Sequence, residues 1–280
     1  MRLGTTDHDR DTAGLLYVYP VVSRRAGGVS VGVNLNPNNA CNWRCNYCQV
    51  PGLVSGNAPP IDLSRLESEL SGFLDAVLSR GWMEEHVPEG ARTLKDVAFS
   101  GNGEPTSSRQ FAEAVEVVVR VLRERDLVGR IEIVLITNGS FAHLPEVRRG
   151  LEAMRGAGGV VWFKVDSATD AGMRAINDAR TGPERQRRNL EIAARACPTW
   201  IQTLMLAIDG QAPSEAEVEA YLALVRHLVA SEVPVQGVLL YGLARTSHQP
   251  EAPRLSALPR EWMEAMAERI RAAGLPVRVS

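Results

Sequence analysis

The stretch Cys41-Asn42-Trp43-Arg44-Cys45-Asn46-Tyr47-Cys48 places three cysteines within eight residues, in the spacing C-x3-C-x2-C. Thiolates are soft ligands, and this spacing lets one loop wrap around a single metal site. A four-iron cluster has four iron corners, and this loop supplies ligands for only three of them. The sequence therefore predicts a cluster whose fourth iron binds a group that is not protein.

Two other metal proteins use cysteines in a similar way. Structural zinc takes four protein ligands, usually as two separated pairs, but the fourth cysteine, Cys197, lies far along the chain and precedes Pro198. An electron-transfer ferredoxin also needs a fourth cysteine nearby. Both are therefore less favoured than the open cluster, and Cys197 is interpreted as a small residue at a helix end.

Composition describes an ordinary globular protein. The chain has 280 residues, 45% of them hydrophobic and 23% charged, which suits one large α/β domain. A net charge of −2 gives no general attraction to nucleic acid or to anionic membranes. The polar N-terminal residues, the clustered cysteines and the lack of a long apolar run predict a cytoplasmic protein without a membrane span.

A strand followed by a helix is repeated six times along the chain. Strands are predicted at 29–36, 96–101, 131–137, 160–166, 200–208 and 235–241, and helices at 62–80, 109–127, 143–156, 183–196, 214–231 and 259–273. Such alternation is typical of parallel strands joined by right-handed crossovers. The predicted fold class is α/β, a partial (β/α)6 TIM-like barrel.

No linker divides this barrel. Residues 1–28 are predicted to form an N-terminal extension, with a strand or extended arm at 15–22 and a turn at 24–28. Residues 29–280 are predicted to form the barrel, which includes the last helix and a short strand at the end of the chain.

One face of several predicted strands is small or polar. In the first strand, Ser30, Gly32, Asn34 and Asn36 alternate with apolar residues, and Trp162, Lys164 and Asp166 do the same in the fourth. Successive residues of a strand point to opposite faces of the sheet. The polar face is therefore predicted to surround a cavity for a polar ligand, because the inside of a packed barrel would be apolar.

Three further motifs end neighbouring strands. Ser100-Gly-Asn-Gly-Glu104-Pro-Thr106 combines glycines, which allow close approach of a ligand, with a glutamate that can accept from an ammonium group. Thr137-Asn138-Gly139 ends the third strand, and Lys164 with Asp166 ends the fourth. Active sites of βα barrels form at the carboxyl ends of strands, so these motifs are predicted to share one site with the cysteines.

C-x3-C-x-aromatic-C after the first strand of a βα barrel resembles the radical S-adenosylmethionine (radical SAM) superfamily. The resemblance implies that Cys41, Cys45 and Cys48 bind a 4Fe-4S cluster, and that the open iron chelates the amino and carboxylate groups of S-adenosylmethionine (SAM). Tyr47 matches the family's aromatic residue near the adenine.

The same resemblance implies roles for the strand-end motifs. Asn102, Gly103 and Glu104 correspond to the family's Gly-Gly-Glu motif, which holds the methionine amino group, and Asn102 departs from it by replacing the first glycine. Thr137 and Asn138 correspond to a segment that lies under the methionine moiety of SAM. Lys164 and Asp166 correspond to a strand that contacts the ribose hydroxyls and the carboxylate of SAM.

The implied chemistry is that of a radical SAM enzyme of the oxidoreductase or lyase type. An external one-electron donor of the flavodoxin or ferredoxin type reduces the cluster, and SAM is cleaved to a 5′-deoxyadenosyl radical that abstracts hydrogen from a substrate. No catalytic residue of the chain is identified. Arg245 and His248 are candidates to face the substrate, although exposed loop positions explain them slightly better.

The substrate is open. The chain resembles the iron–sulfur oxidoreductases related to wyosine-base tRNA enzymes at residues 99–106, 164–166, 174–177 and 255–259. Residues 171–200 carry six arginines against three acidic residues, a patch that could meet phosphates. The chain has no second cysteine set of the kind that wyosine-forming enzymes carry. The alternatives are an activase or an enzyme that modifies a peptide or small molecule, and a non-enzymatic iron–sulfur module.

Overall fold

The computed structural model describes residue Leu3 and residues 14–23 and 27–280. Its centre is an eight-stranded sheet in the order β1-β2-β5-β6-β7-β8-β10-β12. All neighbouring strands of this sheet are parallel except β1 and β2, which are antiparallel. The strands are β1 (Val18–Ser23), β2 (Gly28–Val33), β5 (Leu94–Phe99), β6 (Glu132–Thr137), β7 (Val160–Lys164), β8 (Thr199–Met205), β10 (Val235–Gly242) and β12 (Val277–Val279).

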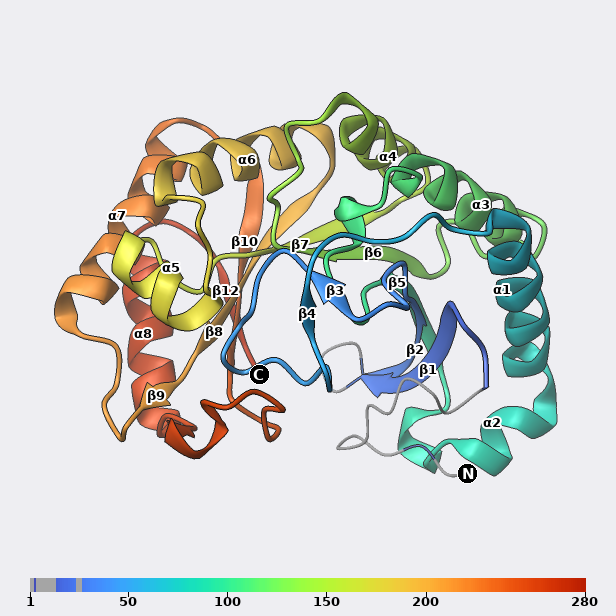
Figure 1. Ribbon diagram of the computed structural model, residues 1–280, viewed down its shortest axis with the longest axis horizontal. Helices are drawn as coiled ribbons and strands as arrows, with labels where there is room; N and C mark the ends of the chain where they lie inside the picture. The colour runs from blue at the N-terminus through green and yellow to red at the C-terminus, as the bar shows by residue number, and fades with distance from the viewer. Residues whose placement is uncertain (1–2, 4–13, 24–26) are drawn as a thin grey trace.

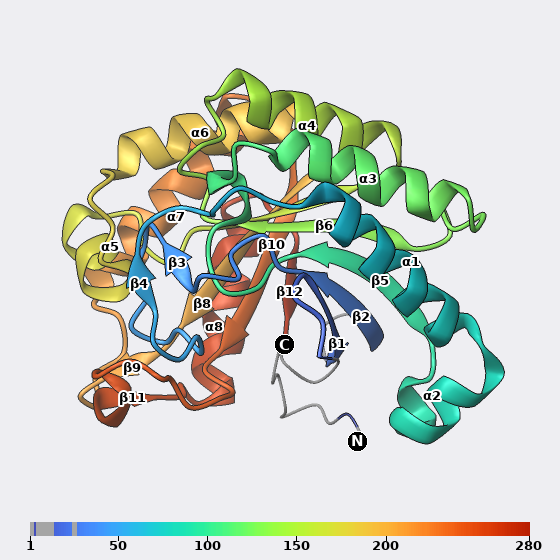
Figure 2. The same cartoon turned by 45° about the vertical axis from the view of Figure 1, so that its right-hand side comes forward.

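Helices surround the outer face of this curved sheet (Figures 1 and 2). They are α1 (Leu63–Leu78), α2 (Arg80–His86), α3 (Phe111–Arg123), α4 (Pro145–Gly156), α5 (Asp170–Asn177), α6 (Pro183–Ala196), α7 (Glu215–Ala230) and α8 (Arg260–Ala272). Single 3-10 turns lie at Glu89–Ala91, Pro105–Ser107 and Ala252–Arg254. Two short ladders, β3 (Ala40–Cys41) with β4 (Val54–Ser55) and β9 (Ala207–Ile208) with β11 (Leu255–Ser256), lie outside the main sheet.

The predicted partial barrel is confirmed. The six predicted strands correspond to β2, β5, β6, β7, β8 and β10, and each predicted helix has its counterpart. The short strand expected at the chain end is β12. Among the described residues, the ladder ends at β1 on one edge and β12 on the other, so the sheet is curved but not closed.

Alternation along the strands separates the core from the lumen. Val31, Val33 and Leu35 of the first unit are fully buried in the main hydrophobic core beneath the helices. The largest apolar contribution comes from α3, where Phe111 packs edge-on against Phe99 of β5, with ring centroids 5.7 Å apart. Burial of these apolar faces is the main source of stability for such layers.

The strand predicted within residues 15–22 is β1, and it belongs to the main sheet. Tyr19 of β1 turns its ring over Gly32, where a Cβ atom would lie 2.1 Å from the ring, and its hydroxyl is 2.7 Å from Ser100 Oγ. The turn predicted at 24–28 falls partly outside the described residues. The division into an extension and a barrel stays a prediction.

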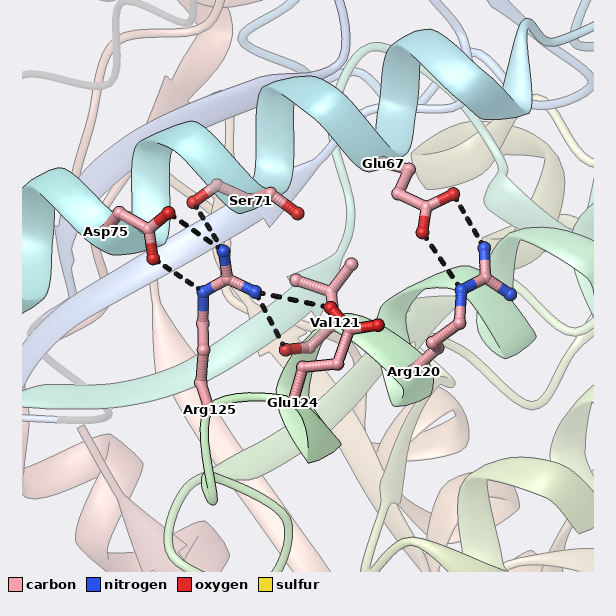
Figure 3. A network of polar contacts seen from close by, with 7 residues as sticks. All are labelled: Glu67, Ser71, Asp75, Arg120, Val121, Glu124 and Arg125. Carbon is pink, nitrogen blue, oxygen red and sulfur yellow. Dashed lines mark hydrogen bonds and ion pairs between the residues drawn. The ribbon is translucent and has the colours of Figure 1, made fainter.

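Two bidentate ion pairs join α1 to α3 and to the turn that follows α3, on the outside of the molecule (Figure 3). Arg120 donates to both oxygens of Glu67, and Arg125 donates to both oxygens of Asp75 at 2.8 and 2.9 Å. Arg125 also donates to the carbonyl oxygen of Ser71 at 3.2 Å. Exposed ion pairs stabilise a fold by at most about 1 kcal/mol each, so these contacts orient helices that the core already holds.

Candidate active site

A cavity of about 580 Å³ lies inside the curved sheet, at the carboxyl ends of its strands. All three loop cysteines line it, together with Glu104 and Lys164. It continues toward the amino ends of the strands as far as Ser30 and Asp96. Ser30, Trp162 and Lys164, which were predicted to face a lumen, line this cavity, and its volume is typical of a site for a small organic ligand or cofactor.

The cysteine loop begins at the end of β3 and lies against α5. Arg44 N donates to the carbonyl oxygen of Asn177 at 3.0 Å, and Asn46 N donates to that of Ile176 at 2.7 Å. These are carbonyl groups of the last turn of α5, which have no partner within the helix. The end of α5 therefore positions the loop through main-chain hydrogen bonds.

The segment after β10 holds the other side of the loop. Ser247 Oγ donates to the carbonyl oxygen of Asn46 at 2.7 Å, and His248 N donates to that of Cys48 at 2.9 Å. Arg44 makes a bidentate pair with Glu251 at 2.8 and 2.9 Å. The loop is therefore clamped between two segments that lie far from it in the sequence.

The three thiols of this loop can each bind a separate iron atom. In an iron–sulfur cluster each thiolate binds its own iron atom. Burial raises the pKa of Cys41 to about 12 and that of Cys45 to about 11. Bound metal ions deprotonate coordinating thiols, so the donor set fits a cationic iron–sulfur centre.

Glu104 is the acceptor at the centre of a dense polar cluster. Its carboxylate, with the residue 2% exposed, accepts four hydrogen bonds: from Thr106 N (3.0 Å), Thr106 Oγ1 (2.5 Å), Thr137 Oγ1 (2.6 Å) and Asn138 N (2.6 Å). Burial raises the pKa of this carboxyl, and the four donors oppose the rise. The structure thus brings Glu104, Thr137 and Asn138 together, as the sequence predicts.

Asn138 and Gly103 connect this cluster to the cysteine loop. Asn138 Nδ2 donates to Asn42 Oδ1 at 2.9 Å. A Cβ atom on Gly103 would lie only 2.0 Å from the carbonyl oxygen of Ala40, so only glycine allows this approach. Asn102 donates from Nδ2 to Asn39 Oδ1 at 2.7 Å.

Lys164 and Asp166 form the opposite wall. Lys164 Nζ is 3.8 Å from Asp166 Oδ2 and donates to Tyr241 OH at 3.0 Å. Burial by itself would lower the pKa of Lys164, but the charge of Asp166 and the contact with Tyr241 outweigh it and raise that pKa. The ammonium group also lies 5.0 Å from the ring centroid of Tyr47. The neighbouring carboxylate of Asp166 therefore favours the charged form of Lys164.

Asp166 joins this wall to the cysteine loop. Its carboxylate accepts from Tyr47 OH, from Asn177 Nδ2 at 2.8 Å and from Leu204 N at 3.0 Å. Burial and the nearby charge of Asp166 raise the pKa of Tyr47 well above its ordinary value. Asn177 Nδ2 also lies 3.3 Å from Cys45 Sγ. One buried carboxylate thus fixes the loop, the end of α5 and β8.

Asn177 and Tyr241 are the site residues that were not predicted from the sequence. Asn177 ends a helix that was not predicted, so nothing local indicates its contact with Cys45. Tyr241 could have been found, because it ends the sixth strand and points into the lumen.

The other candidate residues separate into two groups. Arg245 lines the cavity, whereas the side chain of His248 is exposed and only its main chain contacts the loop. Cys197 is buried in the main core at the end of α6, with Sγ 3.4 Å from the carbonyl oxygen of Gly159. This placement agrees with a small helix-end residue and separates Cys197 from the loop cysteines.

The fold is an open βα barrel, and three cysteines lie at the carboxyl ends of its strands. These two features are typical of βα-barrel proteins that bind an iron–sulfur cluster. The family model of the radical SAM superfamily matches residues 35–222. The chain belongs to the radical SAM superfamily. Membership confirms the predicted enzyme class and its two cofactors, a 4Fe-4S cluster and SAM.

Individual relatives are distant. The chain is 24% identical over 132 residues to "GTPase Obg" of Brachyspira hyodysenteriae, covering 47% of this chain and 17% of that protein. It is 29% identical over 164 residues to "UPF0026 protein MJ1312" of Methanocaldococcus jannaschii, covering 56% and 42%. The chain thus spans less than half the length of these curated relatives, and their names describe those proteins only.

A solved structure supports the fold. The crystal structure of a radical SAM methyltransferase from Sphaerobacter thermophilus superposes with a TM-score of 0.59 at 19% identity, covering 94% of this chain and 68% of that one. This likeness concerns the fold. Among the described residues, no helix is long and apolar enough to cross a membrane.

Proposed function

We propose that Cys41, Cys45 and Cys48 bind three irons of the 4Fe-4S cluster and leave the fourth for SAM. The observation that supports this proposal best is the convergence of all three thiols in one cavity with the buried carboxylate of Glu104 and the ammonium group of Lys164, whose side chain is 14% exposed. When bound, the cluster supplies the electron that cleaves SAM to methionine and a hydrogen-abstracting 5′-deoxyadenosyl radical.

The chain's own residues then bind and orient the cofactor. Glu104 offers a carboxylate to the methionine amino group, with Asn102 and Gly103 beside it. Lys164 offers a cation to the carboxylate, and Asp166 keeps that cation charged. Thr137 and Asn138 hold Glu104 in place, while Tyr47 closes the adenine side. Such positioning, with water excluded from a buried site, is the contribution that a protein makes to cofactor chemistry.

The test uses protein purified without oxygen. We expect about four irons per chain and formation of 5′-deoxyadenosine when SAM is supplied with dithionite or with a reduced donor of the flavodoxin or ferredoxin type. Iron is measured by colorimetric assay and the nucleoside by chromatography. A protein that takes up only zinc, or that forms no 5′-deoxyadenosine under either reductant, would contradict the proposal.

For the substrate, we propose an RNA base as the first candidate, and a peptide or small molecule as the other. The arginines of α5, α6 and their flanks support the first. Arg174, Arg180 and Arg185 are exposed. Arg187 instead pairs with Glu191 at 2.5 Å, and is less suited to meet phosphates.

RNA binding to this surface would be sensitive to salt. We expect Arg174→Ala with Arg185→Ala to weaken tRNA binding and to reduce the slope of log K against log salt by about 1 for each lost phosphate contact. Arg260→Ala on α8, where the side chain is 88% exposed, is the matched control and should leave the slope unchanged. Absent binding, or binding that ignores salt, would favour the peptide or small-molecule substrate.

A further inference from the structure

Trp43 carries a buried hydrogen-bond donor beside two of the cysteines. The residue is 4% exposed and packs with Cys41, Cys45, Met173 and Ala179 in a small cluster separate from the main core. Its indole Nε1 is inaccessible to solvent and has no hydrogen-bond partner among the described residues. Indole nitrogen can only donate, and a buried indole usually finds an acceptor.

The side chains packed with Trp43 are rich in sulfur. Three of the four side chains packed with Trp43 end in or contain sulfur, and the fourth is the methyl group of Ala179. A buried donor without an acceptor costs about 1–3 kcal/mol, so its retention calls for a reason. Thiolates and cluster sulfides are much stronger acceptors than neutral thiols, because they carry negative charge.

We propose that Trp43 donates its Nε1–H to the thiolate sulfur of Cys41 or Cys45 when that thiolate binds the cluster, and that it thereby raises the reduction potential of the cluster. This inference rests on the proposed function, since it needs the loop cysteines as cluster ligands. Reduction adds a negative charge, so a donor stabilises the reduced form more than the oxidised form. Hydrogen bonds to sulfur are one of the known controls of cluster potential.

Asn177 provides a second donor on the same side of the loop. Its Nδ2 lies 3.3 Å from Cys45 Sγ and 2.8 Å from Asp166 Oδ2. It should act in the same direction as Trp43. Because Asn177 also holds Asp166, a change at Asn177 would alter two contacts at once. Trp43 is therefore the cleaner position for a test.

The test is the reduction potential of the reconstituted protein with Trp43→Phe. Phenylalanine keeps an aromatic ring and removes the N–H. We expect the cluster to be about tenfold harder to reduce at a given potential, which is a downward shift of about 59 mV for one electron. The midpoint is measured by a redox titration followed by electron paramagnetic resonance.

The matched control is Trp200→Phe. Trp200 lies on β8 beneath Arg278 and is not among the residues packed on the cysteines, so its midpoint should equal that of the wild type. An unchanged midpoint in Trp43→Phe with full iron content would overturn the inference. So would an equal shift in both variants.

A smaller ring could also loosen the loop and lower the iron content. In that event we would place β-(3-benzothienyl)alanine at position 43. This residue keeps the two-ring shape and replaces only the N–H by sulfur, so it separates the loss of the donor from the loss of volume. A lowered midpoint in this variant supports the inference, and a wild-type midpoint overturns it. These results differ from those expected if the proposed function is wrong, because the wild-type protein itself would then bind no cluster.

Discussion

Cys45→Ala is expected to abolish the iron–sulfur cluster and to reduce 5′-deoxyadenosine formation by more than about 100-fold. Loss of an outer-shell partner of a metal ligand already costs about 10- to 100-fold, and Cys45 is proposed as a ligand itself. The loop has only three cysteines, one for each of three irons, so the loss of one leaves an iron without its protein ligand. Iron content and absorbance of the purified variant measure the loss.

Cys197→Ala is the matched control for this result. Cys197 lies in the main core, and its contact is with the carbonyl oxygen of Gly159 rather than with the loop. The control should keep about four irons per chain and lose about 1 kcal/mol of stability for the lost apolar volume. A Cys45→Ala protein that keeps the cluster, or a Cys197→Ala protein that loses it, would contradict the assignment of the ligands.

Asp166→Asn should have the second largest effect. It removes the charge that faces the buried Lys164 and weakens the acceptor for Tyr47 and Asn177. Breaking one partner of a buried ion pair costs about 3 kcal/mol or more. The loop then loses its anchor, and cluster affinity should fall about 10- to 100-fold, as for other outer-shell partners. Urea unfolding and iron content measure the two effects.

Two further variants make this experiment specific. Asp178→Asn changes a carboxylate of the same region that is 58% exposed and 3.5 Å from Arg44, and it should shift stability by less than about 0.5 kcal/mol. Its backbone φ is +48°, a conformation that asparagine tolerates. Lys164→Met combined with Asp166→Asn should recover part of the stability, because the unpaired cation is gone. If the double variant recovers no stability, the unpaired charge of Lys164 is not the cause of the stability lost in Asp166→Asn.

The repeated units and the apolar faces made most of the fold predictable. Each predicted strand and helix has a counterpart, because a period of two along strands and long helical patterns are signals that lie in adjacent residues. The shorter helix α5 was not predicted, and neither was the antiparallel pairing of β1 with β2. Short elements depend on the partners that they meet, and those partners are distant in the chain.

The residues around Glu104 were predicted to lie close together, but the hydrogen bonds between them were not predicted. The motifs at Glu104, Thr137 and Asn138 were expected at one edge, because parallel strands end together. Their hydrogen bonds to one another follow from side-chain geometry, which spacing does not determine. The docking of the loop on Asn177, 132 residues from Cys45, has no local signal at all.

The sequence by itself determined the ligand chemistry and the side of the sheet on which it lies. Three thiols in one short loop and polar residues at alternate strand positions are local patterns, and they can be recognised without knowledge of the fold. Only the tertiary structure decided how the loop is held, through Asp166, Asn177 and the segment after β10, and which residues Lys164 contacts. Those features arise from contacts between distant segments, such as Lys164 with Tyr241 across 77 residues, and they exist only when the curved sheet brings its strand ends together.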